Sequence, residues 1–333
     1  MTSQAHRCFT LCPRHVSTGM TPLVIDKTIK LEINGSTQQI RMCAERGGLP
    51  PILIVQAGPG FPLLHEVAKF QQCLNLEKDF LVSYWDQRGC GIASQQDAKS
   101  VSLQQQVDDL RTVLQWLKNE TKQTAIVFSV SLGATIALQA AEHECDNIKA
   151  VIAISPDAHT ASSDAFVSSF LREQSVLAKN RRLSTKLMKL GEPPYTDSAA
   201  FQLRAGILAD LGGIERGKRF SALLRETLLS LIGTYGFLGA ARAMRNMNLV
   251  QSKMLPQLVS LNLFSNPPSL AVPVHYIFGE QDPLIPAEIV EQLPVAITTP
   301  KTTVMLVSDA GHMVHFDQPE VVRSIVVRAS NEK

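Results

Sequence analysis

The chain of 333 residues alternates short apolar runs with longer stretches in which apolar positions recur at helical spacing. Residues 27–33 and 39–44 alternate apolar with polar positions on either side of Asn34-Gly35, the pattern of an antiparallel hairpin. Continuous apolar runs after it are typical of parallel strands buried on both faces, and they predict a mostly parallel sheet. There are six such runs, at residues 52–55, 80–84, 125–128, 150–154, 274–278 and 303–307.

Helical periodicity fills most of the intervals between these runs, at residues 65–74, 103–117, 132–144 and 319–327. Strands that alternate with helices in this way favour an α/β fold. We therefore expect a doubly wound, mostly parallel central sheet that is flanked by helices on both faces.

The strand rhythm stops after residue 154 and resumes at residue 274. The interval holds only helical patterns, at residues 162–180, 184–189, 199–211, 220–231 and 239–246. Because the chain exceeds the usual size of a single compact domain, a core with an insertion is expected. We predict a flexible leader over residues 1–22, a core of residues 23–156 and 271–333, and an all-helical cap over residues 157–270.

One strand-to-helix junction has the layout of a catalytic turn. The run at 125–128 leads into Ser129-Val130-Ser131-Leu132-Gly133, and a helix-forming stretch follows at once. A strand, a sharp turn that presents one serine, and a helix beneath it form a nucleophile elbow. The turn needs small residues two before and two after the serine, and Ser129 and Gly133 meet that need. Ser131 is therefore the candidate nucleophile.

Candidate partners for this serine follow the last two apolar runs. Asp282 lies in the loop after the first of them, and His312 lies just after the second. A serine hydroxyl needs a base to take its proton, and a carboxylate fixes the tautomer of that base. The order Ser131, Asp282, His312 is the one that α/β-hydrolases use. Glu280 is the rival acid, and His315 is the rival base.

Two further blocks carry a resemblance to a known family. Residues 56–60 read Gln-Ala-Gly-Pro-Gly, and residues 84–91 read Tyr-Trp-Asp-Gln-Arg-Gly-Cys-Gly. They resemble the His-Gly-Gly-Pro-Gly and Asp-Gln-Arg-Gly-x-Gly blocks of the prolyl-aminopeptidase-like branch of the α/β-hydrolase superfamily. The resemblance covers roughly residues 23–156 and 272–327, and its most specific part is the Asp-Gln-Arg-Gly block.

The resemblance implies an α/β-hydrolase fold with a helical cap inserted over the active site. It implies that the backbone N–H groups of Gly58 and Leu132 form the oxyanion hole. It also implies that Asp86 and Arg88 brace their loop. The sequence departs from the family pattern at Gln56 and Ala57, and at Leu132, where true prolyl aminopeptidases usually carry Trp, so the substrate does not transfer with the fold.

Charge is unevenly distributed between the two parts. Residues 157–270 carry 14 Lys and Arg against 8 Asp and Glu, a net charge of +6, whereas the whole chain carries +2. Prolyl aminopeptidases hold the substrate's amino terminus with cap carboxylates, so a basic cap favours neutral or anionic substrates. We therefore expect poor activity on proline naphthylamide. In the alternative interpretation the cap arginines lie on solvated helix faces and do not affect the substrate. Cap glutamates that face the pocket would weaken the expectation of poor activity on proline naphthylamide.

Other features narrow the class of protein. No apolar run approaches the roughly 18 residues of a membrane-spanning helix, and no basic cluster with interleaved aromatic residues indicates nucleic-acid binding. The six cysteines show neither a disulfide framework nor zinc-ligand spacing, which fits reduced thiols in the cytoplasm. We expect a cytoplasmic enzyme with a small-molecule substrate and with no metal, organic cofactor, membrane or nucleic-acid partner.

These observations together predict a serine hydrolase that acts on an ester, amide or related acyl bond through an acyl-enzyme intermediate. Other uses of the same scaffold stay open: a C–C hydrolase, acyltransferase, lyase or cyclase, or a prolyl aminopeptidase proper. A ligand-binding protein without catalysis is a further alternative.

Overall fold

The structure is a computed structural model that describes residues 23–142, 146–178 and 181–332. The predicted leader over residues 1–22 lies outside the described residues, as do the predicted helix ends at residues 144 and 180.

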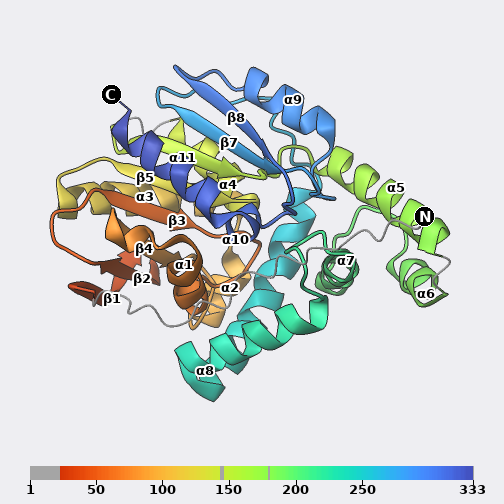
Figure 1. The fold of residues 1–333 in the computed structure, drawn as a ribbon. Helices are drawn as coiled ribbons and strands as arrows, with labels where there is room; N and C mark the ends of the chain where they lie inside the picture. Colours follow the sequence, from red (N-terminus) through yellow and green to blue (C-terminus); the bar gives the residue numbers. More distant parts are fainter. Residues whose placement is uncertain (1–22, 143–145, 179–180, 333) are drawn as a thin grey trace, which may run out of the picture.

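An eight-stranded sheet forms the centre of the molecule, in the order β1-β2-β4-β3-β5-β6-β7-β8 (Figure 1). β1 is antiparallel to β2 and β2 to β4, and every other neighbouring pair is parallel. The strands are β1 (Ile25–Ile33), β2 (Ser36–Ala44), β3 (Pro51–Val55), β4 (Leu81–Asp86), β5 (Ala125–Val130), β6 (Ile148–Ile154), β7 (Val274–Gly279) and β8 (Thr302–Val307). This arrangement confirms the predicted hairpin and the mostly parallel sheet.

Both faces of the central strands are buried because alternate side chains enter two different hydrophobic clusters. In β3, Leu53 and Val55 pack with α3 (Leu103–Thr121) and α4 (Leu132–Ala141). Ile52 and Ile54 pack instead with α1 (Val67–Leu74) and α11 (Pro319–Asn331). The continuous apolar runs thus follow from burial between two layers of helices. The short helices α2 (Gln95–Ser100), α9 (Ala287–Ala296) and α10 (Val314–Asp317) were not among the predicted elements.

The strand β8 departs from this pattern. It is the last strand of the sheet, and its residues are mostly exposed. The expectation that residues 303–307 form a buried run is therefore wrong. An apolar run does not reveal where its strand lies in the sheet, and an edge strand is open to solvent on its outer side.

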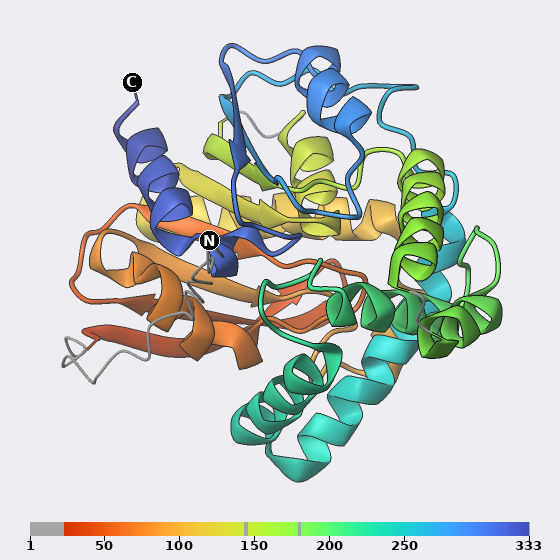
Figure 2. The same cartoon turned by 45° about the vertical axis from the view of Figure 1, so that its right-hand side comes forward.

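The segment between β6 and β7 is helical, as its pattern predicts, apart from isolated bridges at His159 and Ser269. These helices gather on one side of the molecule, where they are green and cyan in Figure 2. They are α5 (Thr160–Ala178), α6 (Arg181–Leu190), α7 (Ser198–Asp210) and α8 (Phe220–Leu258). The two helices predicted at 220–231 and 239–246 are the two halves of α8, which meet at Gly236, where φ is 71°. This insertion fits a cap.

Candidate active site

Ser131 sits at the junction of β5 and α4 in a strained backbone conformation. Its φ and ψ are 52° and −125°, which is rare for a residue with a side chain. Its N–H donates to Ile154 O at 2.8 Å, which fixes the turn against β6. A Cβ added at Gly133 would lie 2.4 Å from Gln56 O, so only glycine allows α4 to approach the end of β3 this closely. The local geometry is that of the predicted elbow.

His312 and Asp282 form a buried pair. His312 Nδ1 donates to Asp282 Oδ2 at 2.8 Å, and the two residues are 4% and 6% exposed. Because Nδ1 carries the proton in this pair, Nε2 is the acceptor nitrogen of the neutral ring. Burial lowers the pKa of His312, but the charge and hydrogen bond of Asp282 raise it, and the net pKa lies above the usual 6.5.

The loop that carries His312 is held by the cap. His312 N donates to Gly213 O at 2.9 Å, and Met313 N donates to Ile214 O at 2.9 Å. Asp317 accepts from Gly311 N at 2.8 Å and from Arg216 N at 2.7 Å. The position of the histidine therefore depends on cap residues as well as on the strand that precedes it.

The rival residues occupy unsuitable places. Glu280 is exposed, and its neighbour Asp282 contacts the histidine. His315 is buried among aromatic rings, stacked on Phe70 at a centroid distance of 5.3 Å. Burial, and then the nearby charge of Lys69, keep the pKa of His315 well below its usual value. His315 thus packs as a core residue.

Asp157 is the site residue that sequence reasoning missed. The Ser131 hydroxyl donates to Asp157 Oδ2 at 3.5 Å, and Thr135 Oγ1 donates to the Asp157 carbonyl at 2.7 Å. Burial raises the pKa of the Asp157 carboxyl, whereas the charges of His312 and Arg204 lower it. Asp157 therefore accepts a hydrogen bond from Ser131 and also interacts electrostatically with His312. The sequence could have indicated this residue, because it follows β6 closely and ligands of α/β sheets bind beyond the carboxyl ends of the strands.

The two residues predicted for the oxyanion hole lie side by side. A Cβ added at Gly58 would lie 3.1 Å from Leu132 Cδ2. Leu132 is the first residue of α4, where backbone N–H groups have no partner within the helix. The unusual Gln56 stabilises the same loop, because its Oε1 accepts from Ala57 N at 3.1 Å and its Nε2 donates to Glu66.

Asp86 joins three segments around this loop. Its Oδ1 accepts from Leu63 N at 2.6 Å and from Leu64 N at 2.9 Å, just after the loop that carries Gly58. Its Oδ2 accepts from Tyr235 of α8 at 2.5 Å. The bracing role implied by the resemblance is confirmed for Asp86, which also ties the cap to the core.

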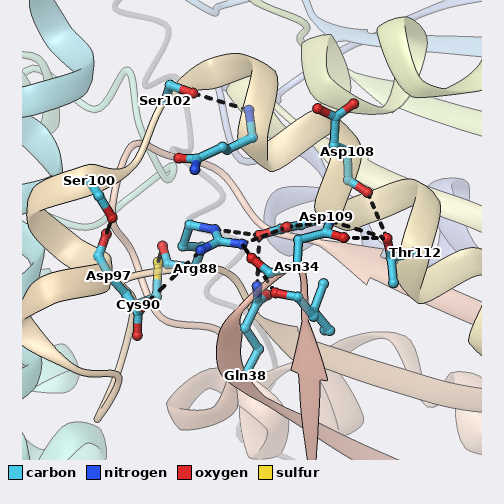
Figure 3. Close-up of polar contacts among 12 residues, drawn as sticks. Asn34, Gln38, Arg88, Cys90, Asp97, Ser100, Ser102, Asp108, Asp109 and Thr112 are labelled. Carbon is cyan, nitrogen blue, oxygen red and sulfur yellow. Dashed lines mark hydrogen bonds and ion pairs between the residues drawn. The ribbon is translucent and has the colours of Figure 1, made fainter.

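Arg88 is the centre of a second buried network, drawn in Figure 3. Its guanidinium donates to both carboxylate oxygens of Asp109, at 2.7 and 2.9 Å, and to the carbonyls of Ile33 and Asn34, both at 3.1 Å. The bracing role is thus confirmed for Arg88 as well, because one side chain joins the β4 loop, α3 and the β1–β2 turn.

Carboxylates neutralise part of the basic charge of the cap. Arg204, whose side chain is 14% exposed, pairs with Asp164, and Arg172 pairs with Glu192 on the surface. Of the cap glutamates, Glu215 is the buried one, and it pairs with lysines of the core and cap. The net charge of residues 157–270 therefore does not describe the charges around Ser131, whose hydroxyl donates to the Asp157 carboxylate.

Residues 23–142, 146–178 and 181–332 offer neither a membrane span nor a metal site. Within them, no helix is long and apolar enough to cross a bilayer. In the same ranges, no group of three or more His, Cys, Asp or Glu side chains could hold a metal ion.

Comparison with known proteins agrees with this fold. "Probable aminopeptidase YbaC" of Bacillus subtilis (strain 168) is 24% identical over 304 residues, which are 90% of this chain and 94% of that protein. VinJ has a similar structure, with a TM-score of 0.63 at 15% identity over 92% of this chain and 98% of its own. Proline iminopeptidase from Mycobacterium smegmatis gives a TM-score of 0.62 at 17% identity over 91% and 97%.

The family model for the alpha/beta hydrolase fold matches residues 50–319, which include the elbow, the buried His312–Asp282 pair and the whole helical insertion. The resemblance to the prolyl-aminopeptidase-like branch is supported by the relatives just described. The chain therefore belongs to the α/β-hydrolase family of enzymes.

Proposed function

We propose that this enzyme is a serine hydrolase that cleaves an ester, amide or related acyl bond with Ser131 as nucleophile, His312 as base and Asp282 as its orienting acid. The observation that carries the proposal is the buried His312–Asp282 hydrogen bond of 2.8 Å. It leaves Nε2 as the proton acceptor, and Asp157 interacts both with this histidine and with the strained serine.

The proposed reaction begins with a change of hydrogen-bond partner. A serine hydroxyl has one proton to donate, so Ser131 turns from Asp157 to Nε2 of His312 before it attacks the acyl carbon. His312 takes the proton, and the resulting imidazolium is stabilised by Asp282. The N–H groups of Gly58 and Leu132 bind the oxyanion at the positive end of α4, where losing one such donor typically costs about 3 kcal/mol. His312 then protonates the leaving group, and water releases the acyl-enzyme.

A second candidate, hydrolysis of aminoacyl substrates, is favoured by Asp157. The expectation of poor activity on proline naphthylamide rests on Leu132 and on a basic cap with no evident carboxylate for a cationic amine. Asp157 supplies a candidate carboxylate, because its Oδ2 lies 3.5 Å from Ser131 Oγ. A carboxylate beside the nucleophile can pair with the α-ammonium group of a bound acyl unit, which avoids an unpaired buried charge. The name of the Bacillus subtilis relative, a probable aminopeptidase, points to the same substrate class.

Fluorophosphonate labelling with peptide mapping tests the nucleophile. We expect the label on Ser131 and none on the Ser131→Ala variant. Ser129→Gly is the matched control, because the Ser129 hydroxyl donates to Ile152 O at 2.8 Å within the sheet and is not proposed to react. Label on Ser129, or full turnover by Ser131→Ala, would overturn the proposal.

The Asp157→Asn variant tests the substrate class. Loss of a charge-assisted hydrogen bond of about 1.5–3 kcal/mol predicts a fall of about 10- to 100-fold in kcat/KM for aminoacyl naphthylamides. Acetyl p-nitrophenyl ester is the control substrate, for which kcat/KM should change little. An equal fall with both substrates would assign Asp157 to the chemistry rather than to the amine, and no fall with either would remove it from the site.

A further inference from the structure

The outer strand β8 exposes an apolar surface at the end of the sheet. Val304, Met305 and Leu306 are 47%, 37% and 53% exposed. In the part of the chain that the structure describes, β7 is the only strand that pairs with β8, so the outer edge of β8 carries unpaired backbone N–H and C=O groups. The strand reads Thr-Thr-Val-Met-Leu-Val and contains no charge, proline or glycine.

Soluble proteins usually protect such an edge. A lysine on the strand, a proline, a bulge or a covering helix prevents pairing with another chain. Over Thr302–Val307, β8 has no lysine, no proline and no bulge. The helix α9 leaves Val304 and Leu306 open to solvent. The edge therefore has the properties of a strand that pairs with another strand in the native assembly.

We propose that β8 pairs antiparallel with β8 of a second copy of this chain, so that one sheet continues through a homodimer. The flanking charges select the partner and the direction. Lys301 precedes the strand, and the exposed Asp309 follows it. With the two-fold axis at Met305, the Lys301 end of each strand lies beside the turn that carries Asp309 in the other copy, where φ of Asp309 is 56°. Opposite charges at adjoining strand ends are favourable.

The same register accounts for the exposed apolar side chains. Side chains two residues apart lie on one face of a strand, so Val304 and Leu306 share a face. In the dimer, Val304 of each copy faces Leu306 of the other, and Met305 faces its own equivalent. A parallel pairing would bring the Lys301 ends of the two strands together, and likewise the Asp309 ends, which is unfavourable. Lys301 also bonds Glu332 of its own chain at 2.7 Å, while half of its side chain stays exposed to a partner.

Light scattering coupled to size exclusion tests the assembly. At about 50 μM, the wild type should have twice the mass of the 36.5-kDa chain, and Val304→Lys/Leu306→Lys should be monomeric. Leu238→Lys is the matched control, because Leu238 is 84% exposed on α8, and this variant should remain dimeric. A monomeric wild type, or a dimer that persists in the double variant, would overturn the proposal.

Cysteine cross-linking tests the register without a disruptive charge. Facing residues of an antiparallel pair have Cα atoms about 4.5–5.5 Å apart, within the range of about 4.4–6.8 Å that a disulfide spans. Met305→Cys should therefore form a disulfide-linked dimer under mild oxidation. Ser308→Cys should not, because its equivalent lies about six residues away along the pair, or roughly 20 Å. Equal cross-linking of Ser308→Cys and Met305→Cys, or none in Met305→Cys, would refute this register.

Discussion

Replacement of Arg88 by methionine tests whether the network beneath the hairpin stabilises the fold. The Arg88 and Asp109 side chains are 4% and 1% exposed and share two hydrogen bonds. Removing one partner of a buried pair leaves an uncompensated charge and typically costs about 3–5 kcal/mol. Asn34 and Gln38 still donate to Asp109, at 2.9 and 2.7 Å, so we expect a loss near the lower limit, about 3 kcal/mol.

Urea unfolding followed by tryptophan fluorescence measures this loss. Trp85 is a suitable reporter, because it is fully buried and donates to Gln38 Oε1 at 2.8 Å. Arg111→Met is the control, since Arg111 pairs with Asp108, whose side chain is 47% exposed, and this variant should lose less than about 1 kcal/mol.

The paired variant Arg88→Met/Asp109→Leu separates the buried charge from the lost packing. It removes both charges but leaves the amides of Asn34 and Gln38 without their acceptor, so we expect it to recover part of the stability that Arg88→Met alone loses. A loss below about 1 kcal/mol in Arg88→Met, or a double variant no more stable than the single one, would refute the reasoning.

Other predictions concern the site directly. Only neutral His312 accepts a proton, and its pKa is raised, so kcat/KM should fall as the pH drops through a value above 6.5. The Asp282→Asn variant should be much slower, and in it this fall should occur at lower pH. An unchanged pH profile in this variant would contradict the assigned pair. His312→Ala should lose about as much activity as Ser131→Ala, because triad members act as a unit, while His315→Phe should stay active in the same assay. Gly133→Ala should lower the unfolding free energy, measured in urea, by about 1–3 kcal/mol, because the added methyl group would clash with the backbone oxygens of Val55 and Gln56. An unchanged urea midpoint would show that α4 can shift freely.

Residues of the site differ in how far the sequence predicts them. Asp282 and His312 each follow a strand closely and lie in short motifs, so a local pattern reveals both. Asp157 also follows a strand, but its relation to Ser131 depends on the neighbouring positions of β5 and β6 in the sheet. Sequence order alone does not show which strand ends meet.

The limits of the predicted helices have a similar cause. The second half of α8 was expected to end at Asn246, yet the helix continues to Leu258. Asn246 is a poor helix former, but its Nδ2 donates to Gly91 O at 3.1 Å and to Ala93 O at 2.9 Å. Contacts with the loop after β4 compensate for its low propensity, and no local pattern reveals them.

The bonds between the cap and the histidine loop have a consequence for protein engineering. Exchanging the whole of residues 157–270 for the cap of a related enzyme would remove Gly213 O, which fixes the backbone of His312. It would also remove the Arg216 N–H that binds Asp317, a carboxyl whose pKa burial raises to about 6. A chimera intended to change specificity should therefore keep residues 212–216 from this chain and graft new sequence on either side of them.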